Sequence, residues 1–491
     1  MLRYLLLGFT LLATVFTAFA TDEKEFKKWL KQHKQEFKTF VDEHDKEFAE
    51  FLKTNWVEAE VKPEEQRDNR PKPVVIPTAK PEPISPPETR PDAPPVPVVK
   101  PLPEITPPEV KPTPSLPKTA KFDYRQGKMS ETKVRMLGQS LRMPALNAPP
   151  LGLVKLSSDR IAEAWMTMAK TGFKPQILAL RQAGQDLALD DWGQALLTHA
   201  YLASERLLDA KNLQLYTWFY LVKQGFDARV AFYDQKVYLM LKVEQKLFGQ
   251  KYFDLESGKY YFVDLAKKRP IQVGSVYTYD KQHASANRQV RIDLSVAPNH
   301  GDTDKERRLT TEFARKAISV STPYNSDYIE FLDHYPQLSM ENYFKAELPF
   351  TTKSSLLNQL RPHLEGLSEA EALNMLLHFV QKSLSYQTDQ QQFNYENYLF
   401  AGETLHYPYA DCEDRAVLYA YLVKNLLGNE VIGLQYDGHI ATAVAVDSDI
   451  GGDSFRVRGK SYIVADPTFI NANVGQTMTG FESQSPQFIV F

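Results

Sequence analysis

The stretch His406-Tyr-Pro-Tyr-Ala-Asp-Cys412-Glu-Asp-Arg415 decides how the rest of the chain is interpreted. Cys412 is the only cysteine of the chain, and it lies between a Tyr-Pro-Tyr turn signal and an apolar run of helical period. This pattern predicts that Cys412 lies in the first turn of a helix. Unpaired backbone N–H groups and the positive end of the helix dipole favour a thiolate at that position.

Strands predicted after this helix supply the two other groups that a cysteine hydrolase needs, a histidine base and a carboxylate that orients it. Residues 430–436 alternate as a strand does, an Asp-Gly hairpin signal follows, and His439 opens the returning strand. A third strand over 459–468 ends in Asp466. We expect His439 and Asp466 to lie side by side on adjacent strands and to face the helix that carries Cys412.

The strand that begins at His439 has two different faces, because successive side chains point to opposite sides of a sheet. One face carries His439, Ala441, Ala443 and Ala445. The other face carries the larger side chains Ile440, Thr442, Val444 and Val446. Since alanine side chains are small, we expect the first face to receive the cysteine helix.

The order and context of these motifs resemble the transglutaminase-like fold of papain-type cysteine enzymes. That family has a cysteine opening a helix, a histidine opening a strand and an aspartate closing the next strand, often before Pro-Thr. The matching segments here are Asp411-Cys412-Glu413-Asp414-Arg415, Gly438-His439-Ile440-Ala441 and Ala465-Asp466-Pro467-Thr468.

The resemblance, which covers about residues 400–480, implies an α+β fold in which the cysteine helix packs on an antiparallel sheet. It also implies that Cys412 is the nucleophile, His439 the general base and Asp466 the acid that orients the imidazole. The chain departs from the family where many members carry an aromatic residue just after the histidine, because Ile440 and Ala441 follow here. This departure bears on substrate preference.

Neighbouring residues also have structural interpretations. Cys412 taken singly is a small core residue as readily as a nucleophile. The charges of Asp411, Glu413 and Asp414 would raise the thiol pKa, which the helix terminus lowers. As first-turn acids they are expected to cap the helix, and Arg415 could neutralise them or hold the loop by an ion pair. His406 is a rival base, but it lies on the same loop as the thiol.

The polar loop over 386–396 precedes the cysteine, where such enzymes form the wall of the cleft. The backbone N–H of Cys412 is the first expected oxyanion donor. The second could be a glutamine of the loop or Tyr409, and the sequence leaves this choice open.

Composition limits the function classes. The chain has 491 residues, enough for two or three domains, and its formal net charge of −3 gives no electrostatic case for a nucleic-acid partner. Asp447, Asp449 and Asp453 lie among glycines but miss the spacing of an EF-hand loop, which favours a hairpin turn over a calcium site. We therefore expect neither a metal nor a cofactor.

Residues 1–20 have the pattern of a secretory signal peptide, with Arg3, a short apolar run and Ala18-Phe19-Ala20 at the end. The apolar run is short for a bilayer span, which disfavours a retained anchor, although cleavage itself is not decided by the sequence. This predicts an exported protein, periplasmic or extracellular. An exported chain with one cysteine has no internal disulfide, which favours a chemical role for Cys412.

Residues 21–60 form an arm with an eleven-residue repeat whose blocks begin at Lys24, Gln35 and Lys46. Eleven residues over three helical turns keep the apolar stripe nearly straight, which predicts one long amphipathic helix. Three partners suit this stripe: a second copy of the chain in a coiled coil, a membrane surface, or the protein's own domains. Residues 61–120 then hold most of the chain's 32 prolines and are expected to form an extended linker.

Related motifs occur twice in the remaining chain. Tyr220-Leu-Val-Lys223 matches Tyr421-Leu-Val-Lys424, and Gly258-Lys-Tyr-Tyr261-Phe-Val263 matches Gly459-Lys-Ser-Tyr462-Ile-Val464. In this register Cys412 aligns with Lys211, His439 with Lys236, and Asp466 with Leu265, next to Asp264. The first copy therefore keeps the scaffold but lacks the nucleophile and the base. Chance similarity between two helix–strand–strand units is the alternative.

This register predicts three regions. Residues 121–270 are interpreted as a degenerate transglutaminase-like domain suited to substrate or partner binding, 271–350 as a β-rich segment, and 351–491 as the catalytic domain. Helices are expected at 158–170, 175–182, 190–208, 213–224, 353–364 and 368–384, and strands at 271–279 and 290–296.

The sequence as a whole predicts an exported cysteine hydrolase, a peptidase or amidase that acts on a protein or cell-wall peptide through an acyl-enzyme. Resolution of the acyl-enzyme by an amine would instead give transamidation. The rival interpretation is a non-catalytic binding or assembly scaffold, for which the arm, the linker and an emptied first copy are equally suited. A homo-oligomer formed through residues 21–60 fits either function.

Overall fold

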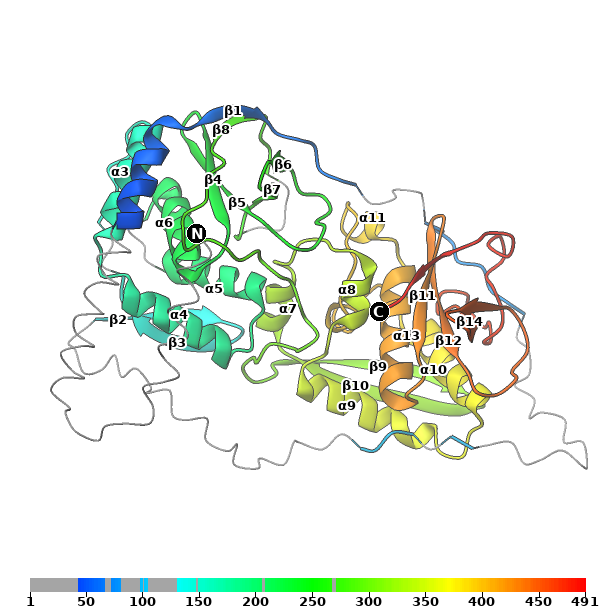
Figure 1. The fold of residues 1–491 in the computed structure, drawn as a ribbon. Coiled ribbons are helices and arrows are strands. Elements are labelled where there is room, and N and C mark those ends of the chain that lie inside the picture. The colour runs from blue at the N-terminus through cyan, green and yellow to red at the C-terminus, as the bar shows by residue number, and fades with distance from the viewer. Residues whose placement is uncertain are drawn as a thin grey trace, which may run out of the picture.

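The computed structural model describes residues 43–66, 72–80, 98–99, 101–104, 130–146, 149–204, 208–266 and 271–491. The predicted signal peptide, the first part of the arm and much of the proline-rich linker lie outside these residues. The described chain is an α+β protein with antiparallel sheets, as the sequence predicts (Figure 1). No helix within the described ranges is both long and apolar enough to cross a bilayer.

Four helices of the first half follow the predicted apolar periodicity. They are α3 (Ser158–Ala169), α4 (Lys174–Asp186), α5 (Asp191–Ala203) and α6 (Ala210–Gln224), and they come after a hairpin of β2 (Glu131–Met136) and β3 (Gln139–Pro144). Three of the helices start where a side-chain oxygen accepts a free backbone N–H, at Ser157, Asp190 and Asp209. Helix α6 ends at Gly225, whose φ of 102° gives the left-handed cap that favours glycine.

The sheet of the first half has the strand order β1-β8-β4-β5-β7-β6. Its strands are β1 (Val57–Glu60), β4 (Ala228–Tyr233), β5 (Lys236–Leu241), β6 (Tyr252–Leu255), β7 (Gly258–Val263) and β8 (Ser275–Thr278). Helix α6 packs on β4 and β5. The apolar side chains of this helix are buried all round, among them Trp218 and Tyr220, so burial on several sides stabilises it.

The end of the predicted arm packs against this first half. Residues 43–54 are helical, and Phe48 and Leu52 of the apolar stripe are buried. The Phe48 ring lies 4.8 Å from that of Trp165, and Asp45 accepts a hydrogen bond from the Trp165 indole N–H at 3.1 Å. This end of the arm therefore binds its own protein. Residues 21–42 lie outside the described chain, and contact with a second copy or a membrane stays a prediction.

The middle of the chain combines strands with two short helices, and β8 lies within the strand predicted over 271–279. It contains β9 (Lys305–Phe313) and β10 (Lys316–Tyr324), which form a hairpin, and two short helices, α7 (Ser326–Leu332) and α8 (Met340–Lys345). The predicted strand over 290–296 is wrong. Its apolar side chains do alternate, but of these described residues only Val290 forms a β-bridge, a single one to Val243, while the Ile292 and Asp293 N–H groups donate to the side chains of Gln245 and Asp190.

Residues 350–491 contain the second large sheet and the helix that begins at Cys412. The helices are α9 (Phe350–Leu360), α10 (Glu369–Ser383), α11 (Asp389–Gln392), α12 (Ala401–Thr404) and α13 (Cys412–Leu426), with a 3₁₀ turn at Arg361–His363. The strands are β11 (Val431–Tyr436), β12 (His439–Ala445), β13 (Ser454–Val457), β14 (Lys460–Ala465) and β15 (Gln487–Ile489), in the order β13-β14-β12-β11-β15. The predicted hairpin at Asp437-Gly438 is confirmed.

The described parts of the proline-rich linker lie on this C-terminal half (Figure 1). Backbone N–H groups of Ala79, Val99 and Leu102 donate to the carbonyls of Ile470, Leu367 and Leu426, at 2.8, 2.8 and 2.9 Å. These stretches are therefore bound to the folded protein. At 72–80, 98–99 and 101–104 the linker is therefore not a free spacer.

Candidate functional site

The thiol of Cys412 lies at the first residue of α13, as predicted. Its side chain is fully buried, and Sγ donates a hydrogen bond to Oε2 of Glu413 at 3.0 Å. Burial and the neighbouring Glu413 carboxylate raise the pKa of the Cys412 thiol well above its usual value. The expected activation by the helix terminus is therefore outweighed, and the thiol is protonated in this conformation.

The imidazole of His439 is bound to Asp466. Antiparallel pairing of β12 and β14 brings the two residues together, and Nε2 of His439 lies 2.7 Å from Oδ2 of Asp466. The other oxygen, Oδ1, accepts the backbone N–H groups of Thr468 and Phe469 at 2.9 and 3.2 Å. Because both carboxylate oxygens are held, the orientation of the ring is fixed, with Nδ1 directed away from the aspartate.

Nδ1 of His439 is buried and has no hydrogen-bond partner among the residues that the structure describes. Cys412 Sγ bonds to Glu413 instead, so thiol and imidazole are not hydrogen-bonded in this conformation. The first turn of α13 is nevertheless tied to the segment after Asp466, because Nη1 of Arg415 lies 3.5 Å from the carbonyl of Pro467.

Arg415 has a different role from the one predicted. Its guanidinium is buried and donates to backbone carbonyls of Ala410, Gln381, Leu384 and Pro467. Burial lowers its pKa to about 10. The predicted ion pair with a first-turn acid is wrong. The rigid guanidinium donates instead to backbone carbonyls from three separate chain segments.

The alanine face of β12 does not receive the cysteine helix, so that expectation is wrong. Ile440 and Val444 lie in the same core as the apolar side chains of α13, whereas Ala441 and Ala443 pack in a second cluster with Tyr436. The ring of His439 lies 4.8 Å from Phe481 and 6.2 Å from Tyr436, on that second side. Larger side chains fill the gap to the helix better than alanine does.

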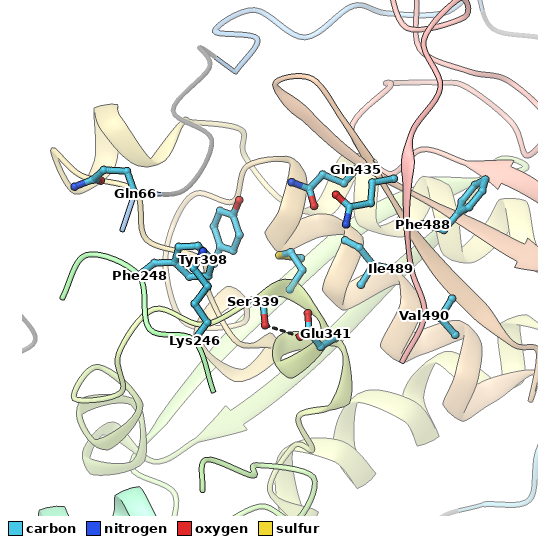
Figure 2. Close-up of a pocket in the computed structure, with 12 residues that line it drawn as sticks. Gln66, Lys246, Phe248, Ser339, Glu341, Tyr398, Gln435, Phe488, Ile489 and Val490 are labelled. Atoms are coloured by element: carbon cyan, nitrogen blue, oxygen red, sulfur yellow. Dashed lines mark hydrogen bonds between the residues drawn. The ribbon is translucent and has the colours of Figure 1, made fainter. Parts of the chain in front are cut away.

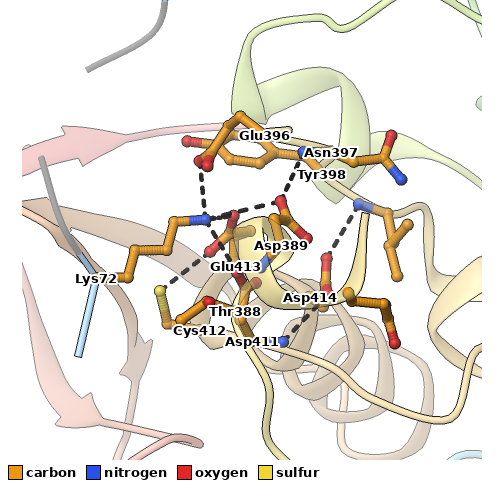
Figure 3. A network of polar contacts seen from close by, with 12 residues as sticks. Lys72, Thr388, Asp389, Glu396, Asn397, Tyr398, Asp411, Cys412, Glu413 and Asp414 are labelled. Atoms are coloured by element: carbon orange, nitrogen blue, oxygen red, sulfur yellow. Dashed lines mark hydrogen bonds and ion pairs between the residues drawn. The ribbon is translucent and has the colours of Figure 1, made fainter. Parts of the chain in front are cut away.

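Carboxylates surround the thiol and converge on one lysine of the linker (Figure 3). The Nζ atom of Lys72 lies 3.0 Å from Oδ2 of Asp411, 2.8 Å from Oε1 of Glu396 and 3.9 Å from Oδ2 of Asp389, and it also donates to Oε1 of Glu413. We call Asp389, Glu396, Asp411 and Glu413 the carboxylate pocket. Burial lowers the pKa of Lys72, but Asp411 and Glu413 outweigh it and raise that pKa well above its usual value.

Burial and mutual repulsion keep part of this acidic group protonated. Burial, and next the Glu413 carboxylate, raise the pKa of Asp411 to about 7, while burial and Asp411 raise those of Asp389 and Asp414 well above their usual range. Asp414 has a capping role, as predicted, because its Oδ2 accepts the backbone N–H of Asp411 at 3.2 Å.

Carboxylate oxygens of this kind could also ligate a cation. Three groups are compact enough, Asp411 with Cys412 and Glu413, Asp389 with Asp411 and Asp414, and Asp389 with Glu396 and Glu413. In the structure the ammonium of Lys72 supplies the positive charge at this place. Within the described ranges, the acids at 447, 449 and 453 do not belong to any such group.

Sequence reasoning missed Lys72 as a member of the site, whereas Tyr386 begins the loop over 386–396 that it assigned to the wall of the cleft. The hydroxyl of Tyr386 donates to the carbonyl of Pro73 at 2.7 Å, next to the thiol, and burial together with the charge of Cys412 raises the pKa of Tyr386. No sequence signal marks Lys72, since the linker holds several lysines between prolines. The rival base His406 packs against the rings of Tyr324 and Tyr407, at 5.0 and 4.9 Å, and burial lowers its pKa.

A cavity of about 590 Å³ lies next to this site, between the two halves (Figure 2). Lys246 and Phe248 of the first half line one side, and Gln435 and Ile489 of the second half line the other. Tyr398 belongs to both places, because it lines the cavity while its ring centre lies 5.1 Å from Nζ of Lys72. The cavity therefore gives an extended ligand room beside the carboxylate pocket.

No family model matches this chain, and searches of the curated proteins and of the solved structures found no similar protein.

Proposed function

We propose that this protein is a cysteine peptidase or amidase of the transglutaminase-like type, with Cys412, His439 and Asp466 as its triad. The observation that carries this proposal is the His439–Asp466 pair at 2.7 Å, which leaves a buried, unpartnered Nδ1 on the imidazole. A buried nitrogen without a partner is costly in a purely structural role. A base that must accept a proton needs a free nitrogen of this kind.

Under this proposal the three groups have the following roles. His439 Nδ1 takes the thiol proton, and the Cys412 sulfur attacks the carbonyl carbon of an amide, whose oxygen becomes an oxyanion near the start of α13. His439 then returns the proton to the leaving nitrogen as the C–N bond breaks, and Asp466 stabilises the imidazolium in between. Water activated by His439 hydrolyses the acyl-enzyme, and an amine in place of water would give transamidation.

The conformation in the structure is a resting one under this proposal. The thiol is protonated and bonded to Glu413, so the proposal requires that this bond break and that the thiol and Nδ1 of His439 come into contact before catalysis.

The proposal includes a papain-type fold for the C-terminal half and a duplication of it in the first half. Its support is that both halves place a helix before two hairpins, with the corresponding strand orders β8-β4-β5-β7-β6 and β15-β11-β12-β14-β13. Export, a protein or cell-wall peptide as substrate, and hydrolysis in preference to transamidation are parts of the same proposal, taken from the signal-peptide pattern and the family resemblance.

Acylation of Cys412 tests the triad without knowledge of the substrate. The purified chain is treated with p-nitrophenyl acetate at pH 7, and the acetyl group on the single cysteine is followed by mass spectrometry. His439→Ala should slow acylation at least about a hundredfold, and Lys236→Ala, at the corresponding strand start of the first half, should leave it unchanged. Added primary amine during deacylation separates hydrolysis from transamidation.

A non-catalytic scaffold is the second candidate, because a fully buried thiol of raised pKa is also typical of a structural cysteine. Equal acylation rates for the parent chain and His439→Ala would establish that candidate and refute the enzyme.

A further inference from the structure

The carboxylate pocket surrounds a primary ammonium. The Lys72 ammonium donates hydrogen bonds to Asp411 and Glu413, and two further carboxylates form ion pairs with it, Glu396 at 2.8 Å and Asp389 at 3.9 Å. The ring of Tyr398 adds a cation–π contact. A structural ion pair needs one carboxylate, whereas four carboxyl groups converge on this lysine, and Oδ1 of Asp411 is buried without a hydrogen-bond partner among the described residues.

The segment that delivers Lys72 is held weakly outside the pocket. Val74 and Val75 are 60% and 85% exposed. The remaining polar contacts are the Tyr386 bond to the carbonyl of Pro73 and the Ala79 N–H bond to Ile470, three residues after Pro467. Residues 72–80 therefore run from the cysteine side of the site to the segment that follows Asp466.

This course is that of an extended peptide in a cleft. A lysine side chain enters a charged pocket beside the thiol, and a hydroxyl next to the thiol holds the following carbonyl. Pro73 follows Lys72 directly, and the linker's prolines keep the segment extended without internal hydrogen bonds. The segment also covers the site, where Cys412, His439 and Asp466 are all nearly inaccessible.

We propose that the carboxylate pocket is a subsite for the lysine side chain of an extended peptide substrate, and that residues 72–80 occupy it in cis as an autoinhibitory strap. This inference rests on the proposed function, because it names the substrate class and the regulation of that same site. A substrate with a lysine at this position must displace Lys72 before its own carbonyl reaches Cys412.

Binding without chemistry tests the subsite. Lys72→Met keeps the aliphatic stem and removes the ammonium, and Cys412→Ala in the same chain prevents any acyl transfer. Calorimetric titration with Nα-acetyl-lysine methylamide should show binding to this double variant at least about tenfold tighter than to Cys412→Ala alone, since the strap no longer competes. Lys80→Met with Cys412→Ala is the matched control, because Lys80 is an exposed lysine of the same segment, and it should bind as weakly as Cys412→Ala.

The uncharged analogue Nα-acetyl-norleucine methylamide should not bind to the double variant. Equal binding of the two analogues, equal affinity with and without Lys72, or no binding to the double variant would each overturn the proposal.

A second measurement uses the unaltered chain, in case Lys72→Met does not fold. Hydrogen exchange at the Ala79 N–H should become faster when the lysine analogue displaces the strap, and should not change with the norleucine analogue. Unchanged exchange at saturating lysine analogue overturns the strap.

The two proposals fail separately. Lysine binding by a chain whose Cys412 acylation does not depend on His439 would refute the enzyme and keep the pocket. Acylation that depends on His439, without lysine binding, would refute the pocket alone.

Discussion

The two halves of the molecule share one arrangement and differ in what it carries. Helix α6 and helix α13 each have 15 residues, each begins after an aspartate, and each is followed by two hairpins with the same strand order. The pairing registers also agree, because Val263 pairs with Leu239 where Ala465 pairs with Thr442. This register gives Lys236 the position of His439, as predicted, but it gives Asp264 the position of Asp466, one residue away from the predicted Leu265. This arrangement of helix and strands therefore forms both with and without a cysteine and a histidine at the two positions.

The two halves differ in the hydrogen bonding of their buried polar side chains, which indicates which of these side chains stabilise the fold and which could take part in a reaction. In the first half the buried Arg229 donates to Tyr279, Asp280, Ser257 and Tyr260, so its guanidinium holds several segments together. In the second half Nδ1 of His439 and Oδ1 of Asp411 are buried without hydrogen-bond partners among the described residues. Unsatisfied polar atoms cost stability, and these two belong to a predicted triad residue and to the residue that precedes Cys412.

The largest expected effect is on the rate of Cys412 acylation, and it compares Asp264, which follows β7, with Asp466, which follows β14. Asp466→Asn should lower the rate of Cys412 acylation and amide turnover by about a thousandfold, because it removes the carboxylate that holds the ring of His439 and stabilises its charged form. Asp264→Asn should change neither rate. Stopped-flow acylation measures both, and equal loss in the two variants would contradict the assignment of chemistry to the second half.

Next in size is the loss of a buried guanidinium. Arg415→Met leaves four buried carbonyls without their donor and should lower the free energy of unfolding by about 3 kcal/mol. Arg229→Met should cost a similar amount, as measured by urea unfolding. Only Arg415→Met should also slow acylation of Cys412, since Arg415 ties α13 to Pro467. Slower acylation in Arg229→Met would mean that the halves are coupled.

A smaller effect concerns the thiol. Because burial and the Glu413 carboxylate raise the pKa of Cys412, Glu413→Gln should lower that pKa. The rate of iodoacetamide alkylation as a function of pH measures the shift on the single cysteine. Glu396→Gln is the matched control, a carboxylate that also contacts Lys72 but does not bond to the thiol. An unchanged midpoint in Glu413→Gln would show that burial alone sets the thiol pKa.

The smallest expected effect is on the pH dependence of stability, and it compares Asp209, which precedes α6, with Asp411, which precedes α13. The pKa of Asp411 is raised to about 7, so its contribution to stability is complete below its unfolded pKa and is lost as the pH rises through about 7. Between pH 6 and 8 this loss is about 1.4 kcal/mol, and Asp411→Asn should abolish it.

Asp209 behaves in the opposite direction. Burial raises its pKa, but hydrogen bonds from Asn212 and Lys211 and the charge of Lys211 together outweigh burial and lower the pKa, so its contribution is present at neutral pH and is lost in acid. Urea unfolding across pH 3 to 8 measures the difference in unfolding free energy between the parent chain and each of the variants Asp209→Asn and Asp411→Asn. This difference should change with pH in opposite directions for the two variants. The same sign in both would contradict the difference between the two helix starts.

Much of the local structure was predictable, because it depends on short-range rules. The helix start at Cys412, the hairpin at Asp437-Gly438, and the meeting of His439 with Asp466 all follow from capping, turn chemistry and strand period. The predicted strand over 290–296 failed for a physical reason, since alternation shows which side chains are buried but not whether a partner strand exists.

The sequence by itself determined the α+β class, the position of the cysteine at a helix start and the pairing of His439 with Asp466, because neighbours along the chain and adjacent strands set these features. Only the tertiary structure decided the state of the thiol and the place of Lys72. Both depend on charges that are far apart in the chain and meet in a buried region, where desolvation and Coulomb interactions are large and no local pattern records them.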